Sequence, residues 1–346
     1  MIPYFLFIII LLWAYNTKNP IAMMLIITIF SVLRFDVGWD YDSYYQAFVD
    51  STSADIAKLS WGPLWGWWID FVYSHDIPFV GIGVPAIITN VFLYYSLKIL
   101  HNGQKKEMAE SILAYSIWPF LYLWSFCTIR QSLAMTLGLF IFALVYRRHI
   151  FPAVGLFIIA HFVHPSSFVI AALIPLVFLK KNVSFKQLLI MVALVVSTMG
   201  ILSKVLTSIG LEPYIDYLSE SDSFGSKISY IYALLSIICL VIQKRVEKDS
   251  DIFSKMFSLL TIGIVLNFLV YATNIPSVLS RAVSYLVVFL SPCFFYGLRK
   301  MTRSKHIQIL IIAGFLAFFF VYLFITQDSP GAVSQYVPYR TIFEKI

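Results

Sequence analysis

Long apolar runs separated by short polar connections extend along the chain from Ile2 to Thr326. Runs of this length are typical of membrane-spanning helices. The predicted spans are 2–15, 20–33, 79–100, 107–126, 129–146, 150–163, 167–179, 187–205, 227–243, 253–273, 279–297 and 306–326. Several are shorter than the ~20 residues that a perpendicular span needs, so we expect some to be tilted or half-spanning. The pattern predicts an all-α integral membrane protein, polytopic, with about twelve spanning or half-spanning helices in a single domain over residues 1–346.

Composition supports this fold class. Hydrophobic residues make up 60% of the 346 residues and charged residues only 12%. A soluble core cannot bury so much apolar surface. The three cysteines, Cys127, Cys239 and Cys293, are scattered in or beside apolar runs, which argues against a disulfide framework and a zinc site. The first run lacks a basic flank and a cleavage site, so we expect a retained helix.

Charge distribution predicts the orientation. Most of the lysines and arginines lie in every second connection, around Lys18, Lys98, Arg147, Lys180 and Lys244 and around residues 299–305. By the positive-inside rule these connections face the cytoplasm, and most carboxylates then lie outside. This orientation predicts outer loops at about 34–78 and 206–226, with an aromatic interfacial or re-entrant segment at residues 61–74. The overall charge of +7 is spread over short loops, so no nucleic-acid partner is implied.

The same orientation brings several charged residues to the outer end of the spans. Arg34 follows the second predicted span, Arg130 begins the fifth, Arg281 lies near the start of the eleventh, and Arg340 follows the last. Four cations near one leaflet repel each other unless anions compensate. Asp36, Asp40 and Asp42 are one source of negative charge. A lipid-linked pyrophosphate is another, because guanidinium groups match phosphate oxygens bidentately.

Each of these residues also has a simpler interpretation. An arginine at a helix end commonly extends toward the membrane interface. His164, in the sequence His161-Phe-Val-His164-Pro-Ser166, can be a satisfied residue at a helix end, and the aspartates can belong to a solvated loop. The tryptophans at 61–68 favour an interfacial belt over a sugar platform. Gly38 is expected to allow the turn that returns Asp40 toward the helix ends.

Taken together, the motifs resemble the EpsG family. The motifs are Arg34-x-Asp36-Val-Gly38-x-Asp40-Tyr-x-x-Tyr44, Ile129-Arg130-Gln131-x-Leu-Ala134, Phe162-x-His164-x-Ser166, Arg281 near the start of a late span, and Val337-Pro-Tyr339. Members are multi-spanning bacterial exopolysaccharide proteins related to Wzy-type O-antigen and capsule polymerases. The resemblance runs from about residue 30 to the C-terminus.

The resemblance implies a glycosyltransferase of the C superfamily in the bacterial cytoplasmic (inner) membrane. Such a polymerase transfers a glycan from undecaprenyl pyrophosphate onto another lipid-linked repeat unit at the outer face. It implies no cofactor and no metal, since cationic side chains can stabilise the departing pyrophosphate. Undecaprenyl-pyrophosphate-linked oligosaccharides and membrane lipid are the expected partners, with a chain-length regulator and a flippase as further ones.

The roles follow from the charges that develop in this reaction. Arg34, Arg130 and Arg281, with Arg340, are assigned to the pyrophosphate. Asp40 or His164 is the general base, and both remain candidates. Supporting positions are Asp36, which is expected to orient Arg34, and Gly38, Tyr44, Gln131, Ser166 and Tyr339.

Other functions fit parts of the pattern. A lipid-linked oligosaccharide flippase or transporter would place charges near the midplane, whereas here they gather at the outer end. An O-antigen ligase uses the same donor with a different acceptor, and the early Arg-Asp-Gly-Asp motif favours the polymerase. A membrane acyltransferase would explain the histidine but not the arginines.

Overall fold

The computed structural model describes residues 1–178, 187, 190, 223–246, 248–249, 252–273, 277–326 and 336–344. These residues are helical almost throughout, apart from one pair of two-residue strands. They group into two compact units, Met1–Ile170 with Ser304–Ile346, and Ala171–Arg303. The prediction of a single membrane domain stays a prediction.

Several helices are long and apolar enough to cross a membrane. Within the described ranges there are five: α6 (Pro78–Leu100), α9 (Ile129–Tyr146), Ser229–Val246 of α14 (Ser223–Val246), Ile252–Ala272 of α15 (Ile252–Thr273), and α18 (Lys305–Ile325). Residues 281–287 and 290–301, bent by 52° between them, make a sixth if they are one span. The protein is therefore a multi-pass membrane protein. The predicted span 187–205 lies outside the described residues except for positions 187 and 190.

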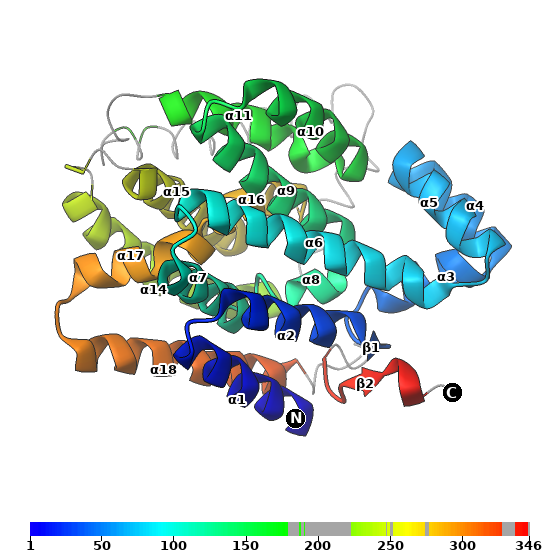
Figure 1. The fold of residues 1–346 in the computed structure, drawn as a ribbon, viewed down its shortest axis with the longest axis horizontal. Coiled ribbons are helices and arrows are strands. Elements are labelled where there is room, and N and C mark those ends of the chain that lie inside the picture. Colours follow the sequence, from blue (N-terminus) through cyan, green and yellow to red (C-terminus); the bar gives the residue numbers. More distant parts are fainter. Residues whose placement is uncertain are drawn as a thin grey trace. The chain divides into compact units, whose positions relative to one another are not determined.

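The first unit contains most of the helices (Figure 1). Besides α6, α9 and α18, its elements are α1 (Ile2–Asn16), α2 (Pro20–Val32), β1 (Arg34–Phe35), α3 (Tyr41–Val49), α4 (Ser51–Trp61), α5 (Pro63–Ser74), α7 (Lys105–Ile117), α8 (Trp124–Cys127), α10 (Ile150–Val163), the 3₁₀ helix η1 (Pro165–Ser167), β2 (Arg340–Thr341) and the 3₁₀ helix η2 (Ile342–Glu344). Helix α6 packs against α2 and α9, and α9 packs against α10. Helix α11 (Phe168–Phe178) follows η1.

Prolines account for two of the breaks in the apolar runs. The predicted span 107–126 is divided between α7 and α8, because Pro119 cannot continue a helix and Trp118 before it is extended, with φ −90° and ψ 108°. The predicted break at His164-Pro165 is present, since α10 ends at Val163 and His164 is extended. A break that the sequence did not predict separates residues 281–287 from residues 290–301.

The predicted outer loop 34–78 is folded rather than irregular. It forms β1 and three helices, of which α4 and α5 lie side by side (Figure 1). Buried residues of α3, α4 and α5 make a small core with Ile82 of α6 and Ile129 of α9. This core fixes the helices of the loop to the first turns of α6 and α9. The other predicted loop, 206–226, lies outside the described residues except for the first turn of α14.

A tryptophan compensates for a proline inside α6. Pro85 has no N–H to donate to the Gly81 carbonyl, four residues earlier. The Trp68 indole N–H of α5 donates to this carbonyl at 3.1 Å. Gly81 also lies so close to the Phe48 ring that an added Cβ would be 2.6 Å from it. The proline and the glycine thus position α3 and α5 against α6.

The C-terminal segment returns to the beginning of the chain. Strand β2 pairs antiparallel with β1, with Arg340 opposite Phe35 and Arg34 opposite Thr341. The Tyr4 hydroxyl of α1 donates to the Tyr336 carbonyl at 2.6 Å. As a result, residues 336–344 lie beside the C-terminal end of α2 (Figure 1).

The second unit includes α14, α15, α16 (Ser277–Val287) and α17 (Leu290–Met301). Helix α15 packs against the other three. Two glycines permit this approach, since a Cβ on Gly263 would lie 2.5 Å from Leu286 and one on Gly297 would lie 2.5 Å from Phe257. Lys300 and Asp249 form an ion pair at 2.6 Å.

Candidate functional site

The predicted site residues of the first unit form two neighbouring groups. The Arg130 cluster comprises Asp40, Tyr44, Trp61, Arg130 and His164. The Arg34 cluster comprises Arg34, Asp36, Tyr41, Tyr339 and Arg340. Gly38 lies between the two clusters. Its backbone lies against Phe126 and Cys127, which end α8. Phe126 contacts Arg34, and Arg130 follows in the first turn of α9.

Arg130 is held by aromatic and carbonyl groups. Its guanidinium carbon lies 4.7 Å from the centre of the Trp61 ring. Its Nε donates to the Tyr44 hydroxyl and its Nη1 to the Trp61 carbonyl, both at 3.4 Å. That carbonyl is in the last turn of α4, where helix carbonyls need partners and favour a cation. Arg130 is therefore oriented while it stays partly exposed.

Tyr44 and Asp40 lie next to each other at the start of α3. The Tyr44 amide donates to the Asp40 carbonyl at 3.1 Å, and Asp40 is the residue that precedes α3. Burial raises the pKa of Tyr44, while Arg130 nearby lowers it and Asp40 nearby raises it. The Tyr44 hydroxyl thus stays protonated at neutral pH. Asp40 is half-buried, which leaves a carboxylate at the edge of the Arg130 cluster.

His164 forms a local motif with Ser166. Its Nδ1 accepts hydrogen bonds from the Ser166 amide at 3.3 Å and from the Ser166 hydroxyl at 2.7 Å. An amide can only donate, so Nδ1 carries no proton in this geometry. The neutral ring therefore carries its proton on Nε2, and that atom is a hydrogen-bond donor. The arrangement favours His164 as a donor over His164 as a base.

Two tryptophans of the loop helices connect His164 to Arg130. The Trp65 indole N–H donates to the Val163 carbonyl at 3.0 Å, one residue before His164. Trp61 and Trp65 contact each other edge to face, with ring centres 6.4 Å apart. The element η1, which follows His164, packs against α9. The structure thus brings Arg130 and His164 into one neighbourhood.

These tryptophans differ from their predicted role as an interfacial belt. Trp65 is only 3% exposed, and Trp61 and Trp68 make inward contacts with Arg130 and Gly81. Trp67, at 62% exposed, is the one that faces outward. Within α5, the four-residue spacing of Trp65 and Ile69 is a signal for an inward face that the sequence contains.

The Arg34 cluster is centred on an enclosed cation. Arg34 is 1% exposed, its Nη1 donates to the Ser31 carbonyl, and its guanidinium carbon lies 4.8 Å from the centre of the Phe126 ring. Its Nε and Nη2 have no hydrogen-bond partner among the described residues, nor does the buried Tyr41 hydroxyl. Burial lowers the pKa of Arg34, and Tyr41 nearby raises it. Because arginine keeps its charge in proteins, two buried donors here lack an acceptor.

The carboxylate of Asp36 is not the partner of Arg34 that the sequence predicted. Its Oδ2 accepts from Nη1 of Arg340 at 2.5 Å. The pairing of β1 with β2 places these two side chains beside each other, which sequence spacing alone does not reveal. The Tyr339 hydroxyl donates to the Phe30 carbonyl, and the two rings stack with centres 4.1 Å apart. Tyr339 and Arg340 therefore fix the C-terminal segment beside Arg34.

Gly38 has the turn role that the sequence predicted. Its φ is +106°, and an added Cβ would lie 2.7 Å from the Phe126 carbonyl oxygen. Only glycine adopts this conformation without strain at such a close approach. The turn continues directly into α3 through a hydrogen bond from the Tyr41 amide to the Gly38 carbonyl at 2.9 Å.

Gly38→Ala is expected to lower the stability of the first unit. The matched control is Gly103→Ala, since Gly103 also has a positive φ, +71°, but an added Cβ there meets nothing within 4 Å. The Gly38 substitution should destabilise by about 1–3 kcal/mol more than the control, because it adds overlap to backbone strain. Thermal unfolding of both variants in the same detergent measures the difference. Equal effects would show that contact with Phe126 is unimportant.

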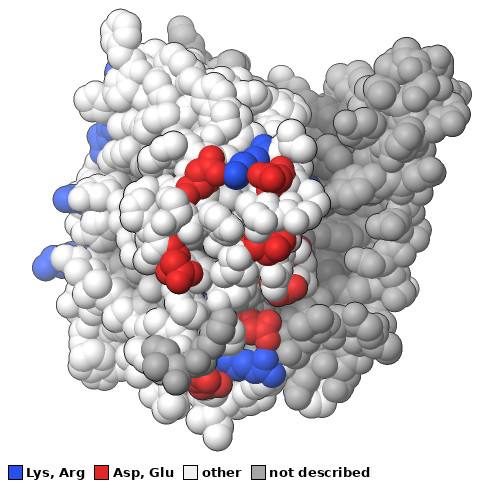
Figure 2. Space-filling model, turned by 90° about the vertical axis from the view of Figure 1, so that its right-hand side faces the viewer, with Lys and Arg blue, Asp and Glu red and all other residues white. Residues whose placement is uncertain are grey.

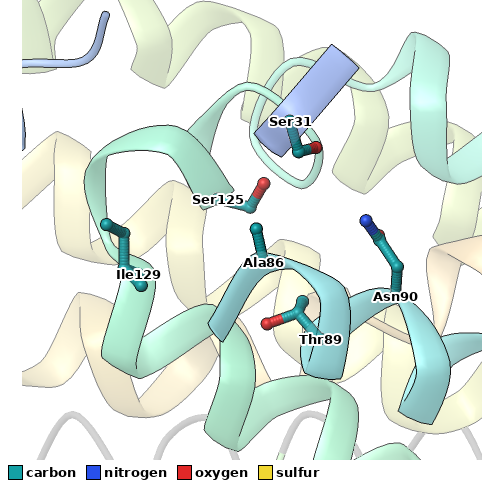
Figure 3. Close-up of a pocket in the computed structure, with 6 residues that line it drawn as sticks. All are labelled: Ser31, Ala86, Thr89, Asn90, Ser125 and Ile129. Carbon is teal, nitrogen blue, oxygen red and sulfur yellow. The ribbon is translucent and has the colours of Figure 1, made fainter. Parts of the chain in front are cut away.

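A small polar cavity is lined in part by Ser31, the residue whose carbonyl group accepts from Arg34. It is lined by Ser31, Ala86, Thr89, Asn90, Ser125 and Ile129 and has a volume of about 10 Å³ (Figure 3). Asn90 is 4% exposed, and no hydrogen bond to its side chain is found among the described residues. The volume is close to the minimum for one water, and amide and hydroxyl groups would serve as its partners. The cavity is too small for a substrate.

Acidic side chains gather on the face that carries the loop helices (Figure 2). Helices α3, α4 and α5, with the residues between and just after them, supply Asp42, Asp50, Asp55, Asp70 and Asp76, all exposed or half-buried. Lys58 forms ion pairs with Asp55 and Asp70. This end of the first unit is thus rich in acids, in line with the predicted outer side.

Gln131 and Arg281 are the two remaining predicted residues. Gln131 follows Arg130 in α9 and is 3% exposed. Arg281 lies in α16 of the second unit and is half-buried. Its convergence with Arg34 and Arg130 stays a prediction.

Comparison with known proteins gives one match. The family model of the EpsG family matches residues 19–341. No curated protein and no solved structure matches the chain. The matched range includes every residue of the two clusters.

Proposed function

Since the chain belongs to the EpsG family, which is linked to exopolysaccharide synthesis, we propose that it is a polysaccharide polymerase. It transfers a glycan from undecaprenyl pyrophosphate onto another lipid-linked repeat unit at the outer face of the bacterial cytoplasmic membrane. The proposal includes a fold of about twelve spanning or half-spanning helices of the glycosyltransferase C type. The observation that supports it best is the Arg130 cluster, where an oriented cation, a carboxylate and a histidine share one neighbourhood.

In the proposed reaction, an acceptor hydroxyl attacks the anomeric carbon of the donor glycan. The new bond joins the hydroxyl oxygen to that carbon, and the bond between the carbon and the phosphate oxygen breaks. The electron pair leaves with the pyrophosphate, and the acceptor proton passes to Asp40. Charge therefore develops on the phosphate, where a positioned guanidinium has its largest effect.

The structure suggests different tasks for the arginines. Arg130 is partly exposed and held in a fixed orientation, so it is the strongest candidate for direct phosphate contact. Arg34 is enclosed in the described conformation and adds positive charge from inside the protein. Arg340 has a side chain that is 43% exposed, and it shares its charge with Asp36. Arg281 is proposed as a further phosphate ligand.

His164 contributes as a donor in this proposal. With Nδ1 engaged by Ser166, its Nε2 proton can bind a phosphate oxygen or an acceptor sugar. Ser166 then acts as a positioning residue that selects this tautomer. The base role is left to Asp40.

Purified protein with synthetic lipid-linked repeats tests the proposed activity. A ladder of products that differ by one repeat unit is expected, and it should form in the presence of EDTA because the guanidinium groups act in place of a divalent cation. The control is the Arg130→Ala variant purified in the same way. Lipid-linked repeats that move across a bilayer without joining would identify a flippase instead. Transfer only to a lipid A core sugar would identify a ligase.

The proposed orientation makes a separate prediction. In a variant without its native cysteines, a cysteine at the exposed position Thr52 should react with a membrane-impermeant thiol reagent added to intact cells. A cysteine at the exposed position Gln104, at the other end of α6, should react only after the cells are opened. The reverse pattern would place the Arg130 cluster in the cytoplasm and exclude the proposed function.

A further inference from the structure

A groove lies at the other end of the first unit, away from the Arg34 and Arg130 clusters. It has a volume of about 470 Å³, within the range of small-molecule sites. Its walls are the turn between α1 and α2, the last turns of α6 and the start of α7. The lining residues are Thr17, Lys18, Asn19, Pro20, Ile21, Tyr94, Lys98, Gly103, Lys105 and Met108. Helix α2, with 13 residues, separates this groove from Arg34 by ~20 Å.

The groove is cationic. Lys18, Lys98 and Lys105 line it, and its lining includes no aspartate or glutamate. None of the three lysines forms a salt bridge among the described residues. The first turns of α2 and α7 border the groove, and helix N-termini add positive potential. Three cations on a concave surface without carboxylates favour an anionic ligand.

The groove also has an apolar side that continues along a helix. Pro20, Ile21 and Met108 line it together with Tyr94. From Ile21, an exposed stripe extends along α2 through Leu25 and Ile29, which are 58%, 57% and 55% exposed. The four-residue spacing places these side chains on one face of the helix. A ligand with a charged head and a long apolar chain fits the groove and the stripe together.

We propose that this groove binds the phosphate of an anionic phospholipid, with an acyl chain along Ile21, Leu25 and Ile29. The lysines lie at the ends of membrane helices, where lipid phosphates are found, and the predicted orientation places them in the cytoplasmic leaflet. A soluble phosphate compound has the same charged head group, but it has no apolar chain that would contact the apolar stripe. The site is separate from the proposed polymerase centre and does not depend on it.

Lipid binding in a neutral detergent tests the proposal. A neutral detergent has no membrane surface potential, so lysines are not attracted to a charged membrane surface in general. Native mass spectrometry of the full-length protein, titrated with phosphatidylglycerol or phosphatidylcholine, gives the affinity for each. The variant Lys18→Gln/Lys98→Gln/Lys105→Gln should bind phosphatidylglycerol on the order of 100-fold more weakly, at about fivefold per lysine. The matched control, Lys106→Gln/Arg148→Gln/Lys305→Gln, removes equal charge from residues outside the groove lining and should stay within about twofold of the parent.

Two further measurements distinguish lipid binding from binding of a soluble phosphate compound. Leu25→Gln keeps all three lysines and should still weaken phosphatidylglycerol binding several-fold. Inorganic phosphate at the lipid concentration should not displace the lipid. Equal losses in the two triple variants, equal retention of phosphatidylcholine, an unchanged Leu25→Gln variant or displacement by inorganic phosphate would each overturn the assignment. Because these are binding measurements, the result stands whether or not the protein polymerises glycans.

Discussion

Replacing Arg130 by alanine is expected to stop polymer formation while lipid-linked single repeats accumulate. The guanidinium is oriented by the Trp61 ring and by two hydrogen bonds, so it meets the departing pyrophosphate without reorganising. Loss of one such charged donor lowers the rate by on the order of 10²–10³. The rate of ladder formation by the purified variant, together with the level of single repeats in cells, measures the effect.

Arg130→Lys should restore little of this activity. Lysine keeps the charge but cannot stack on Trp61 while donating from two fixed nitrogens to the Tyr44 hydroxyl and the Trp61 carbonyl. The matched control is Arg147→Ala, which removes an arginine at the opposite end of the same helix, where it donates to the Ile99 carbonyl at 3.0 Å. That variant should polymerise normally. Full activity of Arg130→Ala would leave Arg130 as a structural residue between α4 and α9.

The sequence predicted those features that depend on residues close together in the chain. Hydrophobic runs predicted a multi-pass helical protein, and the His164-Pro165 break and the Gly38 turn follow from backbone constraints on proline and glycine. The positive-inside pattern also predicted that Arg34, Arg130, His164 and Arg340 would share one end of the molecule. In the first unit they do, because Arg34 follows α2, Arg130 begins α9 and His164 follows α10, while β2 brings Arg340 back to β1.

Contacts between distant segments were not predictable in the same way. Nothing in the spacing indicates that Asp36 pairs with Arg340, since their contact depends on the two-residue pairing of β1 with β2. The enclosure of Arg34 likewise depends on burial by segments far apart in the chain. Trp61 illustrates a third difficulty, because an aromatic residue near a membrane interface has the same sequence signature whether it faces lipid or an arginine.

The identity of the general base gives the second large expected effect. Asp40→Asn should lower transfer by about 10²–10⁴-fold, because it removes a base while keeping nearly the same shape. His164→Gln should be much milder, since the glutamine amide can still donate from near the position of Nε2. Rates of both purified variants at saturating donor and acceptor measure this order. The matched control is Asp42→Asn, an exposed aspartate two residues after Asp40, which should have no effect.

The pH dependence provides an independent test of the same assignment. A histidine base loses activity as the pH falls through ~6.5, whereas a carboxylate base stays active down to pH ~4. Because the Ser166 amide and hydroxyl both donate to Nδ1 of His164, we expect the wild-type rate to pass through pH 6.5 without a large drop. Protonation of Nδ1 would break the bond from the Ser166 amide, because an amide N–H cannot accept. A drop near pH 6.5 that disappears in His164→Gln, together with an active Asp40→Asn variant, would reverse the assignment and make His164 the base.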